Sequence, residues 1–216
     1  MTHSDGDRMG LSIRRCAVAL TLLLAGAALP LRALAEAPAG DATRGARLAY
    51  TCYGCHGIPD YRNAYPNYRV PRLGGQHAGY LVAALGEYRG GLRTHPTMKG
   101  QASSLSDQDA RDIAAFFSAR QAAAGQPVGT APDAAKVCAA CHGADGVGTT
   151  PDYPTLAGQY PDYLAQALKA YRKGGRQNPV MGGFASTLKD EDVEALARYF
   201  AAQRPGLRVP LPPHAP

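Results

Sequence analysis

An internal repeat restricts the fold of this chain more than any other feature of its sequence. When residues 71–121 are aligned with residues 154–204, at an offset of 83, 23 of 51 positions are identical and no gap is needed. The six residues from Pro71 (PRLGGQ) match the six from Pro154 (PTLAGQ). A duplication of this kind predicts two similar structural units that follow one another along the chain.

The hydrophobic pattern within each unit is typical of helices. Apolar side chains recur at positions i, i+3, i+4 and i+7, which place them on one helical face. The first unit has two such stripes, at Leu81, Ala84, Leu85 and Tyr88 and at Ala110, Ile113, Ala114 and Phe117. The second unit repeats them at Leu164, Ala167, Leu168 and Tyr171 and at Val193, Leu196, Ala197 and Phe200. Because alternating strand patterns are absent from the sequence, we predict an all-α fold of two tandem helical domains.

Polar residues and glycines indicate where these helices begin and end. Gly91 and Gly174 suit the position just after a helix, where the backbone turns left-handed. Lys189 stands at the position that matches Ser106 in the second repeat, but its side chain has no hydrogen-bond acceptor. The aspartate that follows it is therefore expected to serve as the cap. Four residues are expected to cap helix N-termini: Asp41, Ser106 (in a capping box with Asp109), Asp133 and Asp190.

The first 35 residues are expected to be a signal peptide for export. Arg14 and Arg15 precede an apolar run from Cys16 to Leu31, and Ala33-Leu34-Ala35 supplies small residues at an A-x-A spacing. The run is shorter than the roughly 20 residues that a membrane-spanning helix needs. A retained anchor is the alternative. We therefore predict a periplasmic protein that is exported through a cleavable signal.

The composition also marks the remaining segments. We predict an N-terminal domain at residues 36–121, a small and flexible linker at 122–132, and a C-terminal domain at 133–204. Residues 205–216 are rich in proline, which lacks the backbone N–H of a helix interior, so this tail is not expected to be helical.

Four of the five cysteines lie in two C-x-x-C-H motifs, Cys52 to His56 and Cys138 to His142. Two thiols three residues apart on one helical turn can form thioethers with both vinyl groups of a haem, and the adjacent histidine can then bind the iron. A zinc site would need four ligands, and a disulfide oxidoreductase would need a βαβ pattern. The motifs therefore predict two covalently bound haem c groups, attached through Cys52, Cys55, Cys138 and Cys141, with His56 and His142 as iron ligands.

The second iron ligand follows from the methionines. Met98 and Met181 are the only methionines after the predicted signal peptide, and they are related by the same offset of 83 residues. A thioether is a soft ligand that favours ferrous iron and raises the reduction potential. Filling the hydrophobic core is the alternative role for these methionines. His95, three residues before Met98, is expected to be a loop residue or a neighbour of a haem propionate, and coordination of the first iron is the alternative.

Other matched residues are candidates to support the iron ligands. Pro71 and Pro154 are expected to offer a backbone carbonyl to the Nδ1–H of the nearby imidazole. Asn178 is a candidate to bond the sulfur of the adjacent methionine. Arg93 and Arg176 are expected either to pair with haem propionates or to lie at solvated helix ends.

The charge pattern excludes one class of partner. The net charge is +6, but lysine and arginine do not form a run. The chain also has no tryptophan and only 7% aromatic residues. A nucleic-acid-binding role is therefore not expected.

The combined pattern resembles the diheme cytochrome c4 family over about residues 40 to 204. The repeated P-x-L-x-G-Q and L-x-D-x-D segments also match that family. The resemblance implies two class I cytochrome c domains packed face to face, with haem propionates near the interface between them. It rests on the predicted haem-binding residues, Cys52, Cys55, His56, Met98, Cys138, Cys141, His142 and Met181.

The resemblance also implies a function and a set of partners. A member of this family passes single electrons between redox proteins, here a terminal oxidase, a bc1-type complex or a dehydrogenase, and it associates with the membrane peripherally through them. We expect no enzymatic activity. The alternatives are a cytochrome subunit of an oxidoreductase complex, such as a sulfide-oxidising dehydrogenase, and a diheme redox enzyme. The tyrosine-rich loop at residues 61–68 and the proline-rich tail depart from the family pattern and are candidates to alter partner choice.

Overall fold

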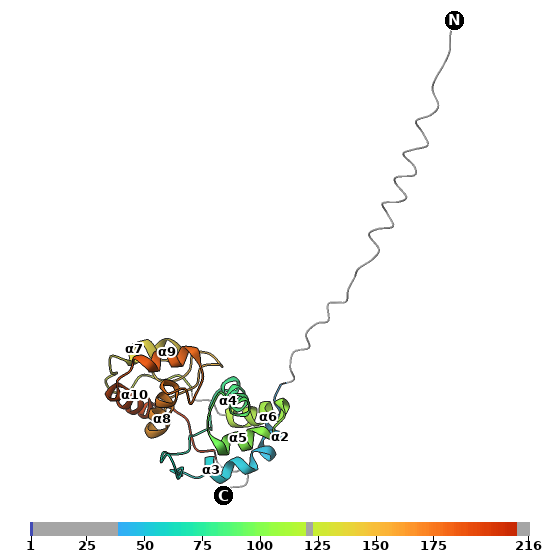
Figure 1. Ribbon diagram of the computed structural model, residues 1–216, viewed down its shortest axis with the longest axis horizontal. Helices are drawn as coiled ribbons and strands as arrows, with labels where there is room; N and C mark the ends of the chain where they lie inside the picture. Colours follow the sequence, from blue (N-terminus) through green and yellow to red (C-terminus); the bar gives the residue numbers. More distant parts are fainter. Residues whose placement is uncertain (2–38, 120–122, 211–216) are drawn as a thin grey trace. The chain divides into compact units, whose positions relative to one another are not determined.

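A computed structural model describes Met1 and residues 39–119 and 123–210 (Figure 1). The predicted signal peptide and the last six residues of the tail lie outside these ranges. The regular structure within them is helical, and strand-like pairing is limited to isolated bridges. In the same ranges, no helix is long and apolar enough to cross a membrane. The prediction of an all-α fold is confirmed.

The helices fall into two sets that follow the repeat (Figure 1). The first set comprises α2 (Ala42–Leu48), the 3-10 helix η1 (Ala49–Cys52), α3 (Tyr53–His56), α4 (Ala78–Gly90), α5 (Pro96–Ser103) and α6 (Asp107–Ser118). The second set comprises α7 (Ala135–His142), α8 (Pro161–Arg172), α9 (Pro179–Thr187) and α10 (Asp190–Ala202).

The core of the first half lies where α6 packs against α2 and α4. It contains the buried Leu81, Ile113, Ala114 and Phe117 that the helical stripes predict. Helices α2 and α6 approach closely at Gly45, where an added Cβ atom would lie 1.9 Å from the carbonyl oxygen of Asp112. Only glycine fits this crossing without displacing the backbone.

The second half has an equivalent core, formed by α10 on α8 with α9 beside them. Leu164 of α8 is buried against Val193, Leu196 and Phe200 of α10. The stripes predicted in the second repeat are therefore also confirmed. Burial of such side chains, at about 25 cal/mol per Å² of apolar surface, is the main stabilising contribution to each half.

Several predicted helix ends are confirmed. The Ser106 hydroxyl accepts from the backbone N–H of Asp109, whose carboxylate accepts from the backbone N–H of Ser106. Asp41 Oδ1 accepts from the N–H groups at positions 43 and 44, over 2.8 and 3.2 Å. Gly91 and Gly174 have left-handed backbones, with φ of 84° and 77°.

Two predicted caps are wrong. Lys189, not Asp190, occupies the N-cap position of α10, and its N–H donates to the Asp192 carboxylate three residues later over 3.1 Å. Asp133 does not cap α7, whose N-cap is Ala134; its carboxylate instead accepts from Lys136 Nζ over 2.9 Å. The Asp190 carboxylate accepts from the Arg172 guanidinium. Asp133 and Asp190 therefore each have a cationic donor other than the backbone N–H that the spacing suggested.

The described parts of the predicted linker and tail are held by specific contacts rather than free. Val128 exchanges two backbone hydrogen bonds, of 2.7 and 2.9 Å, with the side chain of Gln203 at the end of α10. In the tail, Leu207 is buried and its N–H donates to Ala157. The following residue, Arg208, pairs through its backbone with Gly74 of the first half. The start of the tail therefore connects the two repeats.

Candidate functional site

The two predicted histidine ligands have the same surroundings. His56 ends α3 and His142 ends α7, and both imidazoles are buried. His56 Nδ1 lies 2.8 Å from the carbonyl oxygen of Pro71, and His142 Nδ1 lies 2.9 Å from that of Pro154. A carbonyl oxygen only accepts, so Nδ1 must carry the proton. The neutral ring therefore keeps the lone pair of Nε2 for a metal. The carbonyl groups of both prolines thus have the role that was predicted from the sequence.

The electrostatics of these histidines favour the form that binds metal. Burial lowers the pKa of His56 and of His142, because the charged imidazolium is poorly solvated in the interior. The hydrogen bond to the proline carbonyl acts in the opposite direction on each pKa but is the smaller effect. Both imidazoles are thus neutral at physiological pH.

The four motif cysteines, Cys52, Cys55, Cys138 and Cys141, are half-buried and form no disulfide with one another. Burial raises the pKa of the Cys52 and Cys138 thiols. Within the described ranges, no three side chains of His, Cys, Asp or Glu gather as ligands for a metal ion. The zinc alternative therefore lacks the further ligands it needs there, whereas pairs of thiols beside an imidazole fit covalent attachment of haem.

Met98 and Met181 occupy equivalent places near the start of α5 and α9, two residues after a proline. His95 Nδ1 accepts from the N–H of Met98 over 3.3 Å, and Asn178 Oδ1 accepts from the N–H of Met181 over 3.0 Å. His95 and Asn178 are therefore matched helix caps. The amide oxygen of Asn178 is thus bonded to the methionine backbone, and a bond from its amide nitrogen to the sulfur stays a prediction. The role of the two methionines as iron ligands stays a prediction.

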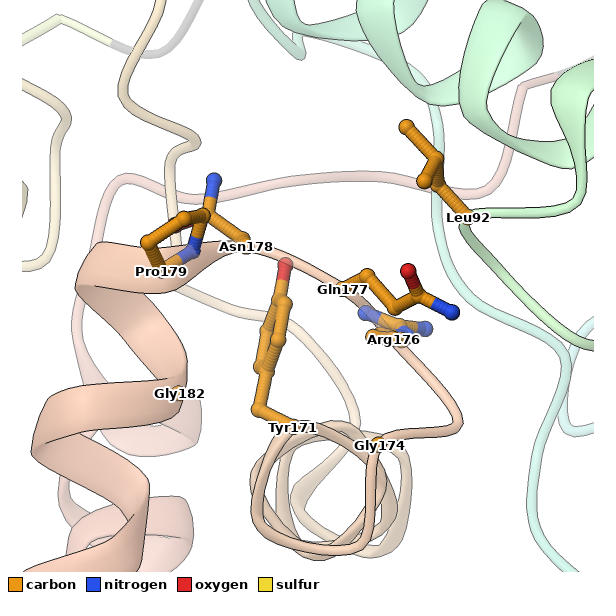
Figure 2. Close-up of a pocket in the computed structure, with 8 residues that line it drawn as sticks. All are labelled: Leu92, Tyr171, Gly174, Arg176, Gln177, Asn178, Pro179 and Gly182. Atoms are coloured by element: carbon orange, nitrogen blue, oxygen red, sulfur yellow. The ribbon is translucent and has the colours of Figure 1, made fainter.

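A cavity of about 490 Å³ lies beside the start of α9 (Figure 2). Figure 2 shows Tyr171 reaching from the end of α8 toward Asn178 and Pro179. Gly182 follows Met181 directly, and an added Cβ there would meet only the carbonyl oxygen of Tyr171, at 4.0 Å. The cavity is lined by Leu92, Tyr171, Gly174, Arg176, Gln177, Asn178, Pro179 and Gly182. The predicted haem-binding residues of the second half are not among those that line this cavity, although Gly182 and Asn178 flank Met181 in the sequence.

The matched arginines are embedded among tyrosines. Arg93 is only 4% exposed; it forms an ion pair with Glu87, donates to the Tyr80 hydroxyl over 3.1 Å and lies over the rings of Tyr80 and Tyr88. The alternative that Arg93 is a solvated helix end is therefore wrong. Burial acts to lower the pKa of Arg93, but charge interactions with Tyr80 and the neighbouring tyrosines raise it overall, so the guanidinium stays charged.

The second half repeats this arrangement. Arg176 donates to the Tyr163 hydroxyl over 3.0 Å and lies over the rings of Tyr163 and Tyr171. Burial raises the pKa of Tyr163 to about 12. The backbones of Arg93 and Arg176 pair with each other. The four tyrosines were not singled out from the sequence as site residues, although the offset of 83 relates them in pairs.

Comparisons with known proteins agree with this geometry. The family model described as cytochrome c matches residues 42–120 and 132–203. The cytochrome c4 of Pseudomonas aeruginosa is 34% identical, over 79% of this chain and 92% of that protein. The thiosulfate dehydrogenase electron acceptor of Stutzerimonas stutzeri is 36% identical, over 71% of this chain and 79% of that protein.

A solved structure gives the same result. The structure of reduced recombinant cytochrome c4 from Pseudomonas stutzeri has a TM-score of 0.61 and 33% sequence identity, covering 77% of this chain and 100% of that one. The fold and the paired haem-binding motifs therefore define a c-type cytochrome with two haem-binding halves that transfers electrons. Within that class, the chain belongs to the diheme cytochrome c4 family, and it carries two covalently bound haem c groups.

Proposed function

We propose that the protein is a periplasmic electron carrier that takes single electrons from a bc1-type complex or a dehydrogenase and delivers them to a terminal acceptor such as an oxidase. We further propose that it has no enzymatic activity of its own. The observation that carries the proposal is the duplicated histidine geometry. In each half, a buried neutral imidazole is fixed by a proline carbonyl with Nε2 left for iron.

The chain's own residues suit this role. When bound, each haem supplies an iron that accepts and releases one electron. The proline carbonyls hold the imidazoles in one orientation, so the ligand does not need to rotate between redox states. The apolar cores around α4 and α6 and around α8 and α10 keep water away. Low polarity favours the less charged ferrous state, and a methionine ligand at each iron would do so as well.

We infer that redox partners dock on the second half. Val180 and Phe184 on α9 and Val137 beside Cys138 are 44–61% exposed. Their first-half counterparts are polar: Thr97 and Gln101 at the offset of 83, and Thr51 at the offset of 86 that relates the two C-x-x-C-H motifs. Thr51 and Gln101 are hydrogen-bonded to each other over 3.1 Å, so we infer that Val137 and Phe184 also lie close together. Partner contacts of electron carriers are small and transient, and exposed apolar side chains grouped on one face suit them.

The matched residues of the first half provide the test of docking. Val180→Thr and Phe184→Gln should slow electron transfer to the physiological acceptor several-fold without changing either reduction potential. Thr97→Val and Gln101→Phe should not slow it. Equal slowing by both pairs, or no slowing by the first pair, would assign docking elsewhere.

A titration followed in the visible spectrum tests the carrier function itself. Full reduction should consume two electrons per chain in one-electron steps, and the oxidised protein should not turn over peroxide or thiosulfate. Turnover of either compound at an enzymatic rate would support a diheme redox enzyme instead.

A second candidate function is that of a stable cytochrome subunit of an oxidoreductase complex. It is favoured by the relative from Stutzerimonas stutzeri, which is named as an electron acceptor of thiosulfate dehydrogenase. Gentle purification of the native protein separates the two functions, because a subunit elutes with its dehydrogenase at stoichiometric ratio, whereas a mobile carrier elutes alone. The signal peptide predicted from the sequence at residues 1–35 supports export to the periplasm in either case.

A further inference from the structure

Two buried glutamines each form hydrogen bonds with the backbone of the opposite repeat. Gln76 of the first half donates from Nε2 to the carbonyl of Thr155 over 3.0 Å and accepts at Oε1 from the N–H of Thr155 over 2.9 Å. Gln159 of the second half makes the same pair with Arg72, over 3.0 and 2.9 Å. Both glutamines are only 4% exposed. They are related by the offset of 83, as are Arg72 and Thr155, so the exchange is symmetric.

The peptide groups that these glutamines contact also serve the predicted iron ligands. The N–H of Arg72 and the carbonyl of Pro71 belong to one peptide group, and that carbonyl accepts from His56 Nδ1. The N–H of Thr155 and the carbonyl of Pro154 likewise form one peptide group, which accepts from His142 Nδ1. A continuous chain of hydrogen bonds therefore runs from each imidazole to a glutamine of the opposite half.

Hydrogen bonds in such a chain polarise one another. When the glutamine oxygen accepts from the peptide N–H, the carbonyl at the other end of that peptide group becomes more negative. It then accepts more strongly from the imidazole Nδ1–H, which makes Nε2 a better electron donor to iron. A stronger donor favours the ferric state and lowers the reduction potential.

We propose that Gln76 and Gln159 are positioning residues that tune the haems crosswise, Gln76 acting on the haem held by His142 and Gln159 on the haem held by His56. This inference rests on the binding of iron by those two histidines. Its consequence is that each haem responds to how the opposite half is docked. A partner that shifts the two halves would change both potentials without touching either iron.

Replacement of each glutamine by leucine tests the crosswise direction. Gln76→Leu should raise the potential of the second haem more than that of the first, and Gln159→Leu should do the reverse. The two potentials are followed separately through the haem methyl resonances of each half during a redox titration. A shift confined to the haem of the mutated half, equal shifts of both haems, or no shift would each overturn the proposal.

Tyr160→Phe is the control that tests whether a weaker contact between the halves is enough by itself to change the potentials. The Tyr160 hydroxyl accepts from the N–H of Asp60 over 3.0 Å, so this neutral change removes one hydrogen bond between the repeats. It leaves both glutamine relays in place, and neither potential should move. A shift as large as that of the glutamine variants would mean that loosening alone explains their effect.

The unmodified protein provides a second test in case the leucine variants do not fold. Exchange of the Arg72 and Thr155 amide protons with deuterium should be slow, because each donates to a buried glutamine oxygen. Rapid exchange of either would show that the relay is not formed. Failure of the proposed carrier function would be seen separately, as the absence of a two-electron titration in the unmodified protein.

Discussion

At the scale of single residues, His95 and Asn178 show how one structural task is done by two side chains. The imidazole Nδ1 of His95 and the amide oxygen of Asn178 accept the same backbone N–H at the start of equivalent helices. The sequence alone leaves His95 as a loop residue, a neighbour of a haem propionate or a competing iron ligand, because histidine is not a usual N-cap residue. The matched position in the other repeat holds Asn178, and this distinguishes capping from iron coordination as the role of His95.

The cap assignment predicts that His95→Asn is tolerated. Asparagine does this task in the second half, so the free energy of unfolding should change by no more than about 0.5 kcal/mol, and the visible spectrum should be unchanged. Asn178→Ala, which removes a cap, should cost about 1 kcal/mol. Urea unfolding of both variants provides the comparison. If the visible spectrum of His95→Asn instead shows the loss of an iron ligand, His95 binds the iron.

The methionine assignment is also tested at single residues. Met98→Ala and Met181→Ala should each lower the potential of one haem, because the soft thioether that favours ferrous iron is lost. Each variant should also lose about half of the weak sulfur-to-iron absorption band and bind carbon monoxide when reduced. If the band persists in full in either variant, that methionine belongs to the core and another residue binds the iron.

At the scale of elements, the crossing of α2 and α6 depends on charge as well as on Gly45. The Arg44 guanidinium contacts the carboxylates of Asp109 and Asp112, and Asp112 also accepts from the backbone N–H of Asp41 over 2.8 Å. Hydrogen bonds to Ser106 lower the pKa of Asp109 to about 2, with a further contribution from Arg44. The backbone hydrogen bond from Asp41 and the ion pair with Arg44 lower the pKa of Asp112.

These shifts predict acid sensitivity of the first half. A carboxylate whose pKa is lower in the folded state adds stability above its unfolded pKa, and that stability is lost as the pH falls toward the folded pKa. Unfolding of the first half should therefore become easier between about pH 4 and pH 2. Urea unfolding across this range should show a smaller pH dependence for Asp112→Asn than for the unmodified protein. An identical pH dependence would contradict this role of Asp112.

Most elements could be predicted from the sequence, because helical periodicity and a capping box are local signals. The stripes through Leu81 and Ile113 and the box at Ser106 are each encoded within a few residues. Asp133 and Asp190 were misassigned because several donors compete for one carboxylate, and spacing alone does not rank them. Two matched C-x-x-C-H motifs predicted the haem attachment, since that chemistry is also encoded locally.

At the scale of the whole molecule, the contacts between the repeats could not be predicted. Gln76 meets Thr155 across 79 residues of sequence, and Arg69 pairs with Asp162 across 93. Neither separation leaves a periodic signal. The tyrosine-rich loop, expected to affect partner choice, contributes to these contacts, since Arg62 within it forms an ion pair with Asp162 over 3.2 Å. Such contacts depend on how two folded halves meet.

The tail contributes to the same assembly through Leu207, which is 3% exposed and follows α10. Leu207→Ala should lower the free energy of unfolding by about 2–4 kcal/mol, because it removes buried apolar surface and leaves a cavity. Val128→Ala, at a half-exposed position, should cost less than 1 kcal/mol by the same reasoning. Thermal unfolding of both variants compares them. Equal losses would mean that the tail does not form part of the core.

The central claim is that two haems, each closed by histidine and methionine, carry electrons and leave no iron position open. A visible redox titration run with and without carbon monoxide tests it most directly, because this gas binds an open ferrous iron and raises its apparent potential. Full reduction is expected to consume two electrons per chain, each in a one-electron step at a potential that carbon monoxide does not change. Consumption of a single electron per chain, or a step that carbon monoxide moves to higher potential, would contradict this proposal.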